Sequence, residues 1–354
     1  MVQTAITTSK AGPVVRNAVT RLREVCESGD IKNYLAVDRK SGEPMHQEAR
    51  QLFASLPAVT PDTNADEIVD LGLWSSIPHN LRRALEMPRY RVGREIFVRT
   101  NASHRVIERL RPVGNYDTNM PLTFTHRAQL CGQMGDYFVA LVDGAPKPLR
   151  FLRSEVYAWN EPTPIPQSGS ISGVQFDYND PLLKAHICAA FVELEEEAGN
   201  LDFNEPEEKV RSQQIHLIRR ITSRVQMNYA GRSENYAGAN VGALLSYGQG
   251  VCFTQRAVAL ILLAPFCKSL GFDLQAAIGR TLRLGVPHGF AIVVLRPSLS
   301  RYVVDPAWGE PLTDLRVAFF GPVWGQDRQL VGLEGSADTN ISPEAIDLPE
   351  ITVS

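Results

Sequence analysis

Apolar and polar residues repeat with two different periods along the chain, and the period predicts where helices and strands form. Helical spacing predicts an amphipathic helix over residues 181–198 and further helical segments over 14–26, 48–56 and 205–229. A nearly continuous apolar run from Phe253 to Leu263 predicts a central, buried helix, which Pro265 should kink or end. Alternating apolar and polar positions predict strands over 94–100, 136–142, 273–280, 288–295 and 301–305. These elements together predict an α+β protein.

Proline and glycine interrupt these patterns most strongly between residues 160 and 180, where Pro162, Pro164, Pro166, Gly169 and Gly173 occur. Such residues favour turns over regular elements, so we expect a domain boundary in this region. The predicted organisation is a flexible tail over 1–13, an N-terminal mixed helix and strand region of unknown role over 14–160, a second domain over 181–330 and a C-terminal tail over 331–354.

The composition is that of an ordinary globular protein, with 44% hydrophobic and 21% charged residues. A formal net charge of −3 gives no general attraction to nucleic acid or to an anionic membrane, so we expect neither as a partner. No apolar run reaches the roughly 18 residues of a membrane span, and residues 1–13 lack the apolar segment of a secretory signal. Five cysteines, an odd number at scattered positions, predict reduced thiols in a cytoplasmic protein.

Cys252 lies where a glycine-rich turn runs directly into the predicted central helix, in the sequence Tyr247-Gly-Gln-Gly-Val-Cys-Phe-Thr-Gln-Arg256. Unpaired backbone N–H groups and the helix dipole favour an anion at such a position. We therefore expect the pKa of this thiol to be lowered, and the same N–H groups can form part of an oxyanion hole during acyl transfer. Gly248 and Gly250 allow a backbone or a substrate to approach closely.

His288 begins one predicted strand and Asp305 ends the next, and the short connection between the strands predicts an antiparallel hairpin. With the turn centred near Ser298, His288 falls opposite Trp308, and Asp305 lies within a few residues of His288. A small register shift or a bulge then brings the carboxylate to the imidazole. If the start of the Cys252 helix packs against this end of the sheet, a nucleophile, a base and a group that orients the base are assembled.

Each of these three residues has an ordinary structural explanation when it is taken alone. A cysteine at a helix start can be inert, a histidine at a strand end can be a satisfied core residue, and an aspartate before proline is often a turn former. Together, in this order and in these local contexts, they favour catalysis. The sequence has no Cys-x-x-Cys pair and no His-Glu-x-x-His motif, so we expect no metal site, and we expect no cofactor.

The chain around these residues resembles the core of the transglutaminase-like superfamily, which is related to the papain-like cysteine peptidases. The resemblance extends from about residue 215 to residue 312, and it rests on Tyr229, Leu244-Leu-Ser-Tyr-Gly-Gln-Gly-Val-Cys252, Gly271, Ile278-Gly279, His288 and Tyr302-Val-Val-Asp-Pro-Ala-Trp-Gly309. This chain departs from the family at His288-Gly289-Phe290, where the family usually has His-Ala-Trp. The substitution keeps an aromatic residue but loses the indole N–H.

The resemblance implies a papain-like core, in which a helix bearing a nucleophilic cysteine packs on an antiparallel sheet, here with an N-terminal α/β extension. It implies Cys252 as the nucleophile, His288 as general base and acid, and Asp305 as the residue that holds the imidazole. Weaker candidates for contacts with an oxyanion or a substrate are Gln249, Tyr236, Phe290 and Trp308.

The expected reaction is cysteine-dependent acyl transfer through an acyl-enzyme. The expected acyl donor is a peptide, a protein side-chain amide or a thioester, and the expected acceptor is an amine. Two alternatives stay open, namely hydrolysis of a peptide or amide, and a catalytically silent interaction module. Thiol reactivity separates the module from an enzyme, because a module should have five sluggish cysteines.

Overall fold

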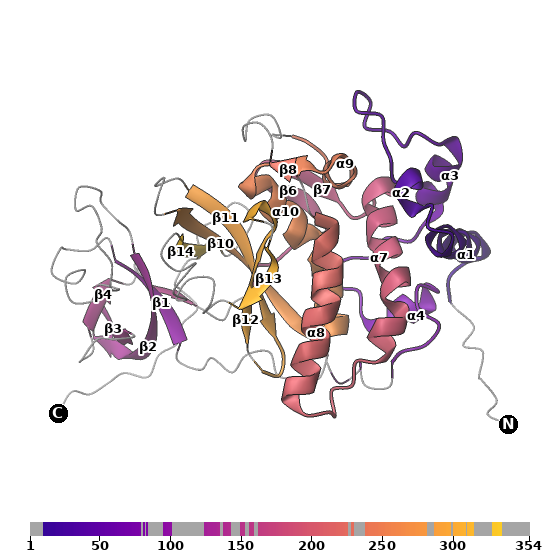
Figure 1. The fold of residues 1–354 in the computed structure, drawn as a ribbon. Coiled ribbons are helices and arrows are strands. Elements are labelled where there is room, and N and C mark those ends of the chain that lie inside the picture. Colours follow the sequence, from indigo (N-terminus) through magenta and orange to yellow (C-terminus); the bar gives the residue numbers. More distant parts are fainter. Residues whose placement is uncertain are drawn as a thin grey trace.

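Within the described residues, the chain folds into helices and antiparallel sheets (Figure 1). The structure is a computed structural model that describes residues 10–78, 81, 83, 95–100, 124–134, 137–142, 149–152, 156–158, 162–225, 228–229, 238–281, 287–298, 300–308, 310–314 and 328–334. The predicted α+β class is confirmed by this mixture of elements.

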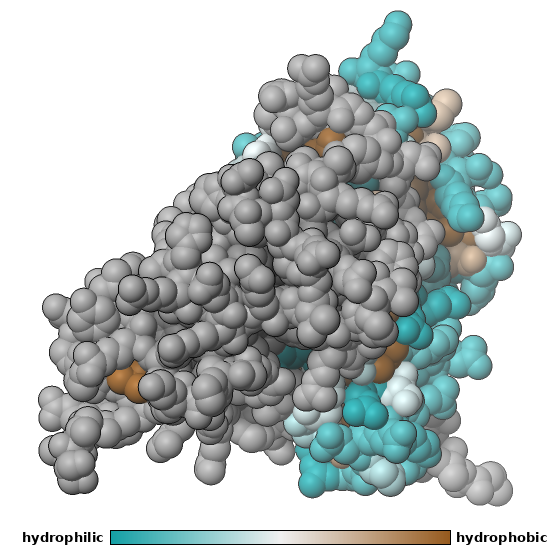
Figure 2. Space-filling view, turned by 60° about the vertical axis from the view of Figure 1, so that its left-hand side comes forward, coloured by the Kyte–Doolittle hydropathy of each residue, from teal (hydrophilic) through white to brown (hydrophobic). Residues whose placement is uncertain are grey.

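The N-terminal helices lie beyond α7 (Pro181–Gly199) from the sheets (Figure 1). These helices are α1 (Pro13–Glu27), α2 (Ile31–Tyr34), α3 (Gln47–Ser55) and α4 (Ala65–Asp70). Two of them confirm the helices predicted over 14–26 and 48–56. Both α1 and α3 contact α7. Their outward surface is mainly hydrophilic (Figure 2).

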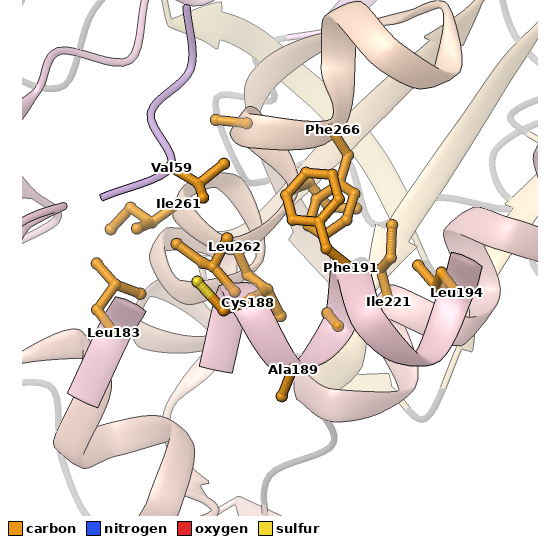
Figure 3. Packing of buried hydrophobic residues seen from close by; sticks show 14 of the residues in the cluster. Val59, Leu183, Cys188, Ala189, Phe191, Leu194, Ile221, Ile261, Leu262 and Phe266 are labelled. Carbon is orange, nitrogen blue, oxygen red and sulfur yellow. The ribbon is translucent and has the colours of Figure 1, made fainter. Parts of the chain in front are cut away.

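The hydrophobic core continues across residues 160–180, where a boundary was expected, because one buried cluster joins side chains from Ala18–Leu81 with side chains from Ile171–Leu312. Trp74 donates its indole N–H to the carbonyl of Phe191 at 2.9 Å, and the two rings pack edge to face. Figure 3 shows Phe191 stacked on Phe266, with ring centroids 4.0 Å apart. The helices before residue 81 are therefore packed into the same core as the elements that follow residue 171.

Helix α7 confirms the helix predicted over 181–198, but it is not amphipathic as predicted. It is buried on nearly all sides. It contacts α1 and α3 as well as α8 (Glu207–Thr222) and α9 (Val241–Tyr247), and this burial explains the difference. The helix begins sharply because the Asp180 carboxylate accepts the Leu183 N–H at 2.8 Å.

The helical stretch predicted over 205–229 ends earlier than expected. After α8 the chain forms a 3₁₀ turn, η2 (Ser223–Val225), and then the short strand β8 (Asn228–Tyr229). This strand pairs in parallel with β9 (Gln249–Gly250), just before Cys252. A pairing with a distant part of the chain therefore replaces the last turns of the predicted helix.

The sheet nearest the candidate site has the strand order β13-β12-β11-β10-β14. Its strands are β10 (Phe272–Thr281), β11 (Pro287–Leu295), β12 (Arg301–Asp305), β13 (Glu310–Asp314) and β14 (Arg328–Glu334). The first three confirm the strands predicted over 273–280, 288–295 and 301–305. Strand β14 extends this sheet to Glu334, beyond residue 330 where a tail was expected to begin. Helix α10 (Cys252–Leu263) contacts β10, β11 and β12.

The other large sheet has the order β4-β3-β2-β1-β5, and β2 also contacts β14 of the first sheet. Its strands are β1 (Glu95–Thr100), β2 (Phe124–Met134), β3 (Tyr137–Val142), β4 (Leu149–Leu152) and β5 (Val156–Ala158). The strands predicted over 94–100 and 136–142 are thus present. A separate hairpin, β6 (Ser168–Ile171) and β7 (Val174–Asp177), occupies the expected seam.

The helical run from Cys252 to Leu270 is the one segment of the described chain that is long and apolar enough to cross a membrane. It comprises α10, the 3₁₀ turn η4 (Ala264–Phe266) and α11 (Cys267–Leu270). The sequence had suggested no run of this length. Because 83% of its window is buried inside the fold, it is the core helix around which the other elements pack.

Replacing Trp74 by alanine should destabilise the whole molecule, since this residue ties the N-terminal helices to α7. We expect the free energy of unfolding to fall by about 3–5 kcal/mol, as for other buried aromatic truncations. Urea unfolding followed by circular dichroism measures the change, and Met45→Ala, at a side chain that is 65% exposed, is the control. Two separate transitions, with only one of them shifted, would show that the N-terminal helices are an independent unit.

Candidate active site

The turn before Cys252 fixes the start of α10. Gly248 ends α9 in the left-handed region, with φ 60°, and donates its N–H to the carbonyl of Leu244. The buried side-chain amide of Gln255 donates to the carbonyl of Gly250 at 2.9 Å, and this hydrogen bond stabilises the turn. The cap residue of α10 is Val251, whose side chain makes no capping hydrogen bond. The first N–H groups of α10 are therefore not satisfied by a capping side chain, as an anion site at a helix start requires.

The β11–β12 register decides where Asp305 lies. Ala291 pairs with Val304 and Ile292 pairs with Val303, so continuing the register by one residue sets Asp305 opposite Phe290. The register predicted from the sequence set His288 opposite Trp308, which places Phe290 opposite Pro306, so the prediction was displaced by one residue. Because side chains alternate between the two faces of a strand, this one-residue difference puts Asp305 on the same face as His288.

His288 and Asp305 are joined by a hydrogen bond of 2.7 Å between Nε2 and Oδ2. Asp305 is fully buried, and His288 is 6% exposed. A carboxylate removed from water is tolerated only when it is paired, so the imidazole is the natural partner for this charge. Since Asp305 occupies Nε2, the other ring nitrogen, Nδ1, is the one left to face Cys252.

The Cys252 thiol lies within hydrogen-bond reach of His288 and of two backbone N–H groups, those of Gly289 and Phe253. Burial alone would raise the pKa of this thiol, because it disfavours the charged form. The hydrogen bond with His288, the two backbone N–H groups and the imidazolium charge outweigh burial and lower the pKa. The environment thus favours a thiolate, as the sequence predicted.

The pKa of His288 moves in the opposite direction. Burial by itself would lower it, but the hydrogen bond to Asp305 and the contact with Cys252 dominate and raise the pKa to about 9. A lowered thiol pKa and a raised imidazole pKa together favour a thiolate–imidazolium pair near neutral pH.

Gly289 lies where there is no room for a larger residue. A Cβ at this position would lie 2.8 Å from the ring of Phe253 and 3.3 Å from Cδ of Arg256. No side chain fits at that distance without displacing the ring. The glycine lets the first turn of α10 lie close against β11, so that the Gly289 N–H reaches the sulfur of Cys252.

The weaker candidates have different positions. Gln249 is half-buried and pairs with Asn228 between β9 and β8. Phe290 is only 1% exposed, and its ring lies 6.2 Å from the imidazole of His288, so its contact is with the base. Tyr236 lies outside the described residues, as does the side chain of Trp308, whose backbone is in η5 (Pro306–Trp308).

Arg256 and Phe253 were not singled out from the sequence. Arg256 is 2% exposed, and its guanidinium lies over the ring of Phe253, 5.0 Å from the centroid. A usable signal was present, because Arg256 directly precedes the apolar run over 257–263, and a cation in a buried helix must find partners.

The other described cysteines differ from Cys252 in their chemistry. Burial raises the pKa of Cys26 and of Cys188 to about 12, so neither is a nucleophile near neutral pH. Cys267 is half-buried, and its sulfur lies 3.8 Å from the carbonyl of Leu263. Among the described residues no group of three or more His, Cys, Asp or Glu side chains is arranged to hold a metal ion.

Comparison with known proteins gives little beyond a distant structural relation. No protein-family model matches the sequence, and no curated protein matches it. The structure is similar to Legionella pneumophila LapG over 43% of this chain and 81% of that chain, with 15% sequence identity and a TM-score of 0.27. LapG in its EGTA-treated form matches over 43% and 82%, with 16% identity and a TM-score of 0.27. Similarity at this level is compatible with a papain-like core, and it carries no argument about activity.

Alkylation should distinguish Cys252 from the other thiols. At pH 7 we expect iodoacetamide to modify Cys252 first and to leave Cys26 and Cys188 unmodified, because the pKa of Cys252 is lowered whereas burial raises the pKa of the other two. His288→Ala removes the hydrogen bond and the charge, and should slow the reaction of Cys252 about tenfold or more. Peptide mass spectrometry across pH measures both effects.

The matched control for that variant is His186→Ala, which removes another buried histidine, one bonded to Ser246 rather than to Cys252. It should leave the reactivity of Cys252 unchanged. Equal slowing in both histidine variants would mean that the effect is a general loss of structure.

Gly289→Ala should disturb the site through overpacking. The added methyl group pushes against Phe253, which we expect to cost about 1–3 kcal/mol and to slow alkylation of Cys252. Phe253→Leu in the same chain should restore part of the loss by removing the ring. Gly199→Ala, where a Cβ meets nothing within 4 Å, is the control. An unchanged alkylation rate in Gly289→Ala would contradict the close approach of Phe253 to Gly289.

Proposed function

We propose that this protein is a cysteine-dependent acyltransferase that works through an acyl-enzyme on Cys252. The observation that carries the proposal is the convergence of three side chains from three elements. Cys252 starts α10, His288 lies on β11, and Asp305 ends β12, with the 2.7 Å bond from Asp305 holding the imidazole against the thiol. This is the geometry of a nucleophile, a base and a group that orients the base.

In the first step, the Cys252 sulfur attacks the carbonyl carbon of an amide, ester or thioester. The bond between that carbon and the leaving group breaks, and His288 gives its proton to the departing atom. The acyl group is then held on sulfur as a thioester. Asp305 accepts the hydrogen bond from Nε2 and stabilises the imidazolium from the opposite side of the ring.

In the second step, an amine nitrogen attacks the thioester while His288 accepts the proton from that nitrogen. The carbon–sulfur bond breaks, and the thiolate and the imidazolium are regenerated. Cys252 and His288 are only 8% and 6% exposed, so the thioester has little contact with bulk water before an acceptor is bound. Hydrolysis follows the same two steps, with water in place of the amine.

The free energy needed to bury the charged and polar groups of the site argues against a silent interaction module. A buried carboxylate and a buried imidazole are expensive to desolvate, and apolar residues of similar size would often be as stable or more stable. Keeping a thiol in contact with this pair adds a polar group that the core does not need. Catalysis explains why these groups are present, whereas binding alone does not.

Acylation can be tested with p-nitrophenyl acetate as donor and hydroxylamine or a primary alkylamine as acceptor. We expect a burst of nitrophenolate equal to one acyl group per chain, an acetyl group on Cys252 by mass spectrometry, and an amide product that grows with amine concentration. Cys252→Ala should abolish the burst, while Cys267→Ala should keep it.

The outcomes separate the alternatives. Acetate as the product at every amine concentration would replace transfer by hydrolysis, with the same acyl-enzyme. No acyl group on Cys252, in a protein that is folded by circular dichroism, would overturn the proposal in favour of a silent module.

A further inference from the structure

Arg256 is a buried cation, one helical turn after the nucleophile, and its hydrogen bonds lead to two distant parts of the chain. One guanidinium nitrogen, Nη1, donates to the carbonyl of Ala277 on β10 at 3.1 Å. The other, Nη2, donates to the hydroxyl of Ser172 at 2.5 Å. A planar fork that binds two acceptors in different directions fixes the orientation of the whole side chain. The start of α10 is therefore tied to the sheet and to a loop at the same time.

The first of these bonds lies beside the base. Ala277 pairs with Phe290, and the next residue along β10, Ile278, pairs with Gly289. The guanidinium also covers the ring of Phe253, and that ring lies against Gly289. Phe253 is thus held between Arg256 and the backbone that follows His288. The backbone of Gly289 that packs against Phe253 also provides the N–H that reaches the sulfur of Cys252.

The second bond reaches the tip of the β6–β7 hairpin. Ser172 has φ 53° and Gly173 has φ 79°, so both central residues of the turn are left-handed, as a two-residue hairpin turn requires. Serine is strained in this region, where glycine is not. The strain has an explanation if the hydroxyl is needed as the acceptor for Arg256.

The same hairpin also holds the chain that leads into α9. The carbonyl of Gly173 accepts the N–H of Gly238 at 2.8 Å, and Gln175 donates its N–H to Ala239 at 2.9 Å. The hairpin therefore contacts the segment before α9 and, through Arg256, the first turns of α10. The turn that carries Cys252 lies between these two attachments.

We propose that Arg256 is a positioning residue for the nucleophile, which holds the first turn of α10 against β11 through Phe253 and uses Ser172 as its anchor. The inference rests on the proposed function and adds to it a link between the β6–β7 hairpin and the thiol. Arg256 need not touch the substrate. It keeps the sulfur of Cys252 at the imidazole of His288 and at the Gly289 N–H.

The decisive readout is the pH profile of Cys252 alkylation by iodoacetamide, in the full chain. Among the described residues, the thiol faces His288 from β11, with Asp305 of β12 behind the imidazole, and Arg256 lies one turn further along α10. Arg256→Lys keeps the charge but offers one ammonium in place of the fork, so it cannot hold both acceptors in the same geometry. We expect the profile to move to higher pH and the rate at pH 7 to fall about tenfold.

Arg296→Lys is the matched control. Arg296 is also buried, at 3% exposed, and it bonds to the carbonyl of Phe272 and to Asp273 at the other end of β10. Its replacement should lower the thermal midpoint as that of Arg256 does, without moving the pH profile. An equal shift of the profile in both lysine variants would overturn the positioning role.

Ser172→Gly gives a second test that does not depend on a buried substitution. Glycine relieves the positive φ, so the variant should fold at least as well as the wild type, while the anchor hydroxyl is lost. We expect a shift of the pH profile in the same direction as in Arg256→Lys, but smaller. A profile that is unchanged in Ser172→Gly and Arg256→Lys, with a reactive wild-type Cys252, would overturn the inference alone. An unreactive Cys252 in the wild type would overturn the proposed function with it.

Discussion

The hydrogen bond between His288 and Asp305 is the interaction on which the site depends. It joins two strands at the end of the sheet, and it pairs a fully buried carboxylate that would otherwise be very unfavourable. It occupies one ring nitrogen and turns the other toward Cys252. The hairpin register sets this contact, while the glycine after the histidine and the position of α10 bring the thiol to the imidazole that Asp305 orients.

The rest of the fold supports that contact by holding α10 in place. The helix is covered by β10–β12 on one side and contacts α8 and α9, which in turn pack against α7. The N-terminal helices close the far side of α7 through Trp74. Close packing along the whole length of α10 fixes its position, so its first turn holds Cys252 in one place relative to the sheet. The site is therefore a local arrangement held by a core that spans most of the described chain.

The sequence was sufficient for most of the predicted helices and strands and for proposing the three residues that the structure brings together, since helix periodicity, strand alternation and the glycine turn before Cys252 are local signals. It was insufficient for the register of β11 and β12, because a one-residue difference in a hairpin depends on how the turn is built and on which face is buried. It also missed the role of Gly289, whose reason is the ring of Phe253 on another element. The partners of Arg256 are 84 and 21 residues away, and no short pattern encodes them.

The pKa of the His288 imidazole tests the central contact most directly. It can be measured by nuclear magnetic resonance titration of protein labelled at the histidine rings, with His288→Gln to assign the signal. The contact with Asp305 predicts a pKa of about 9, so that the ring stays protonated through neutral pH and loses its proton only above it. Asp305→Asn should then bring the value down. A wild-type pKa near the ordinary value of about 6.5, or below it as burial alone would give, would contradict the account.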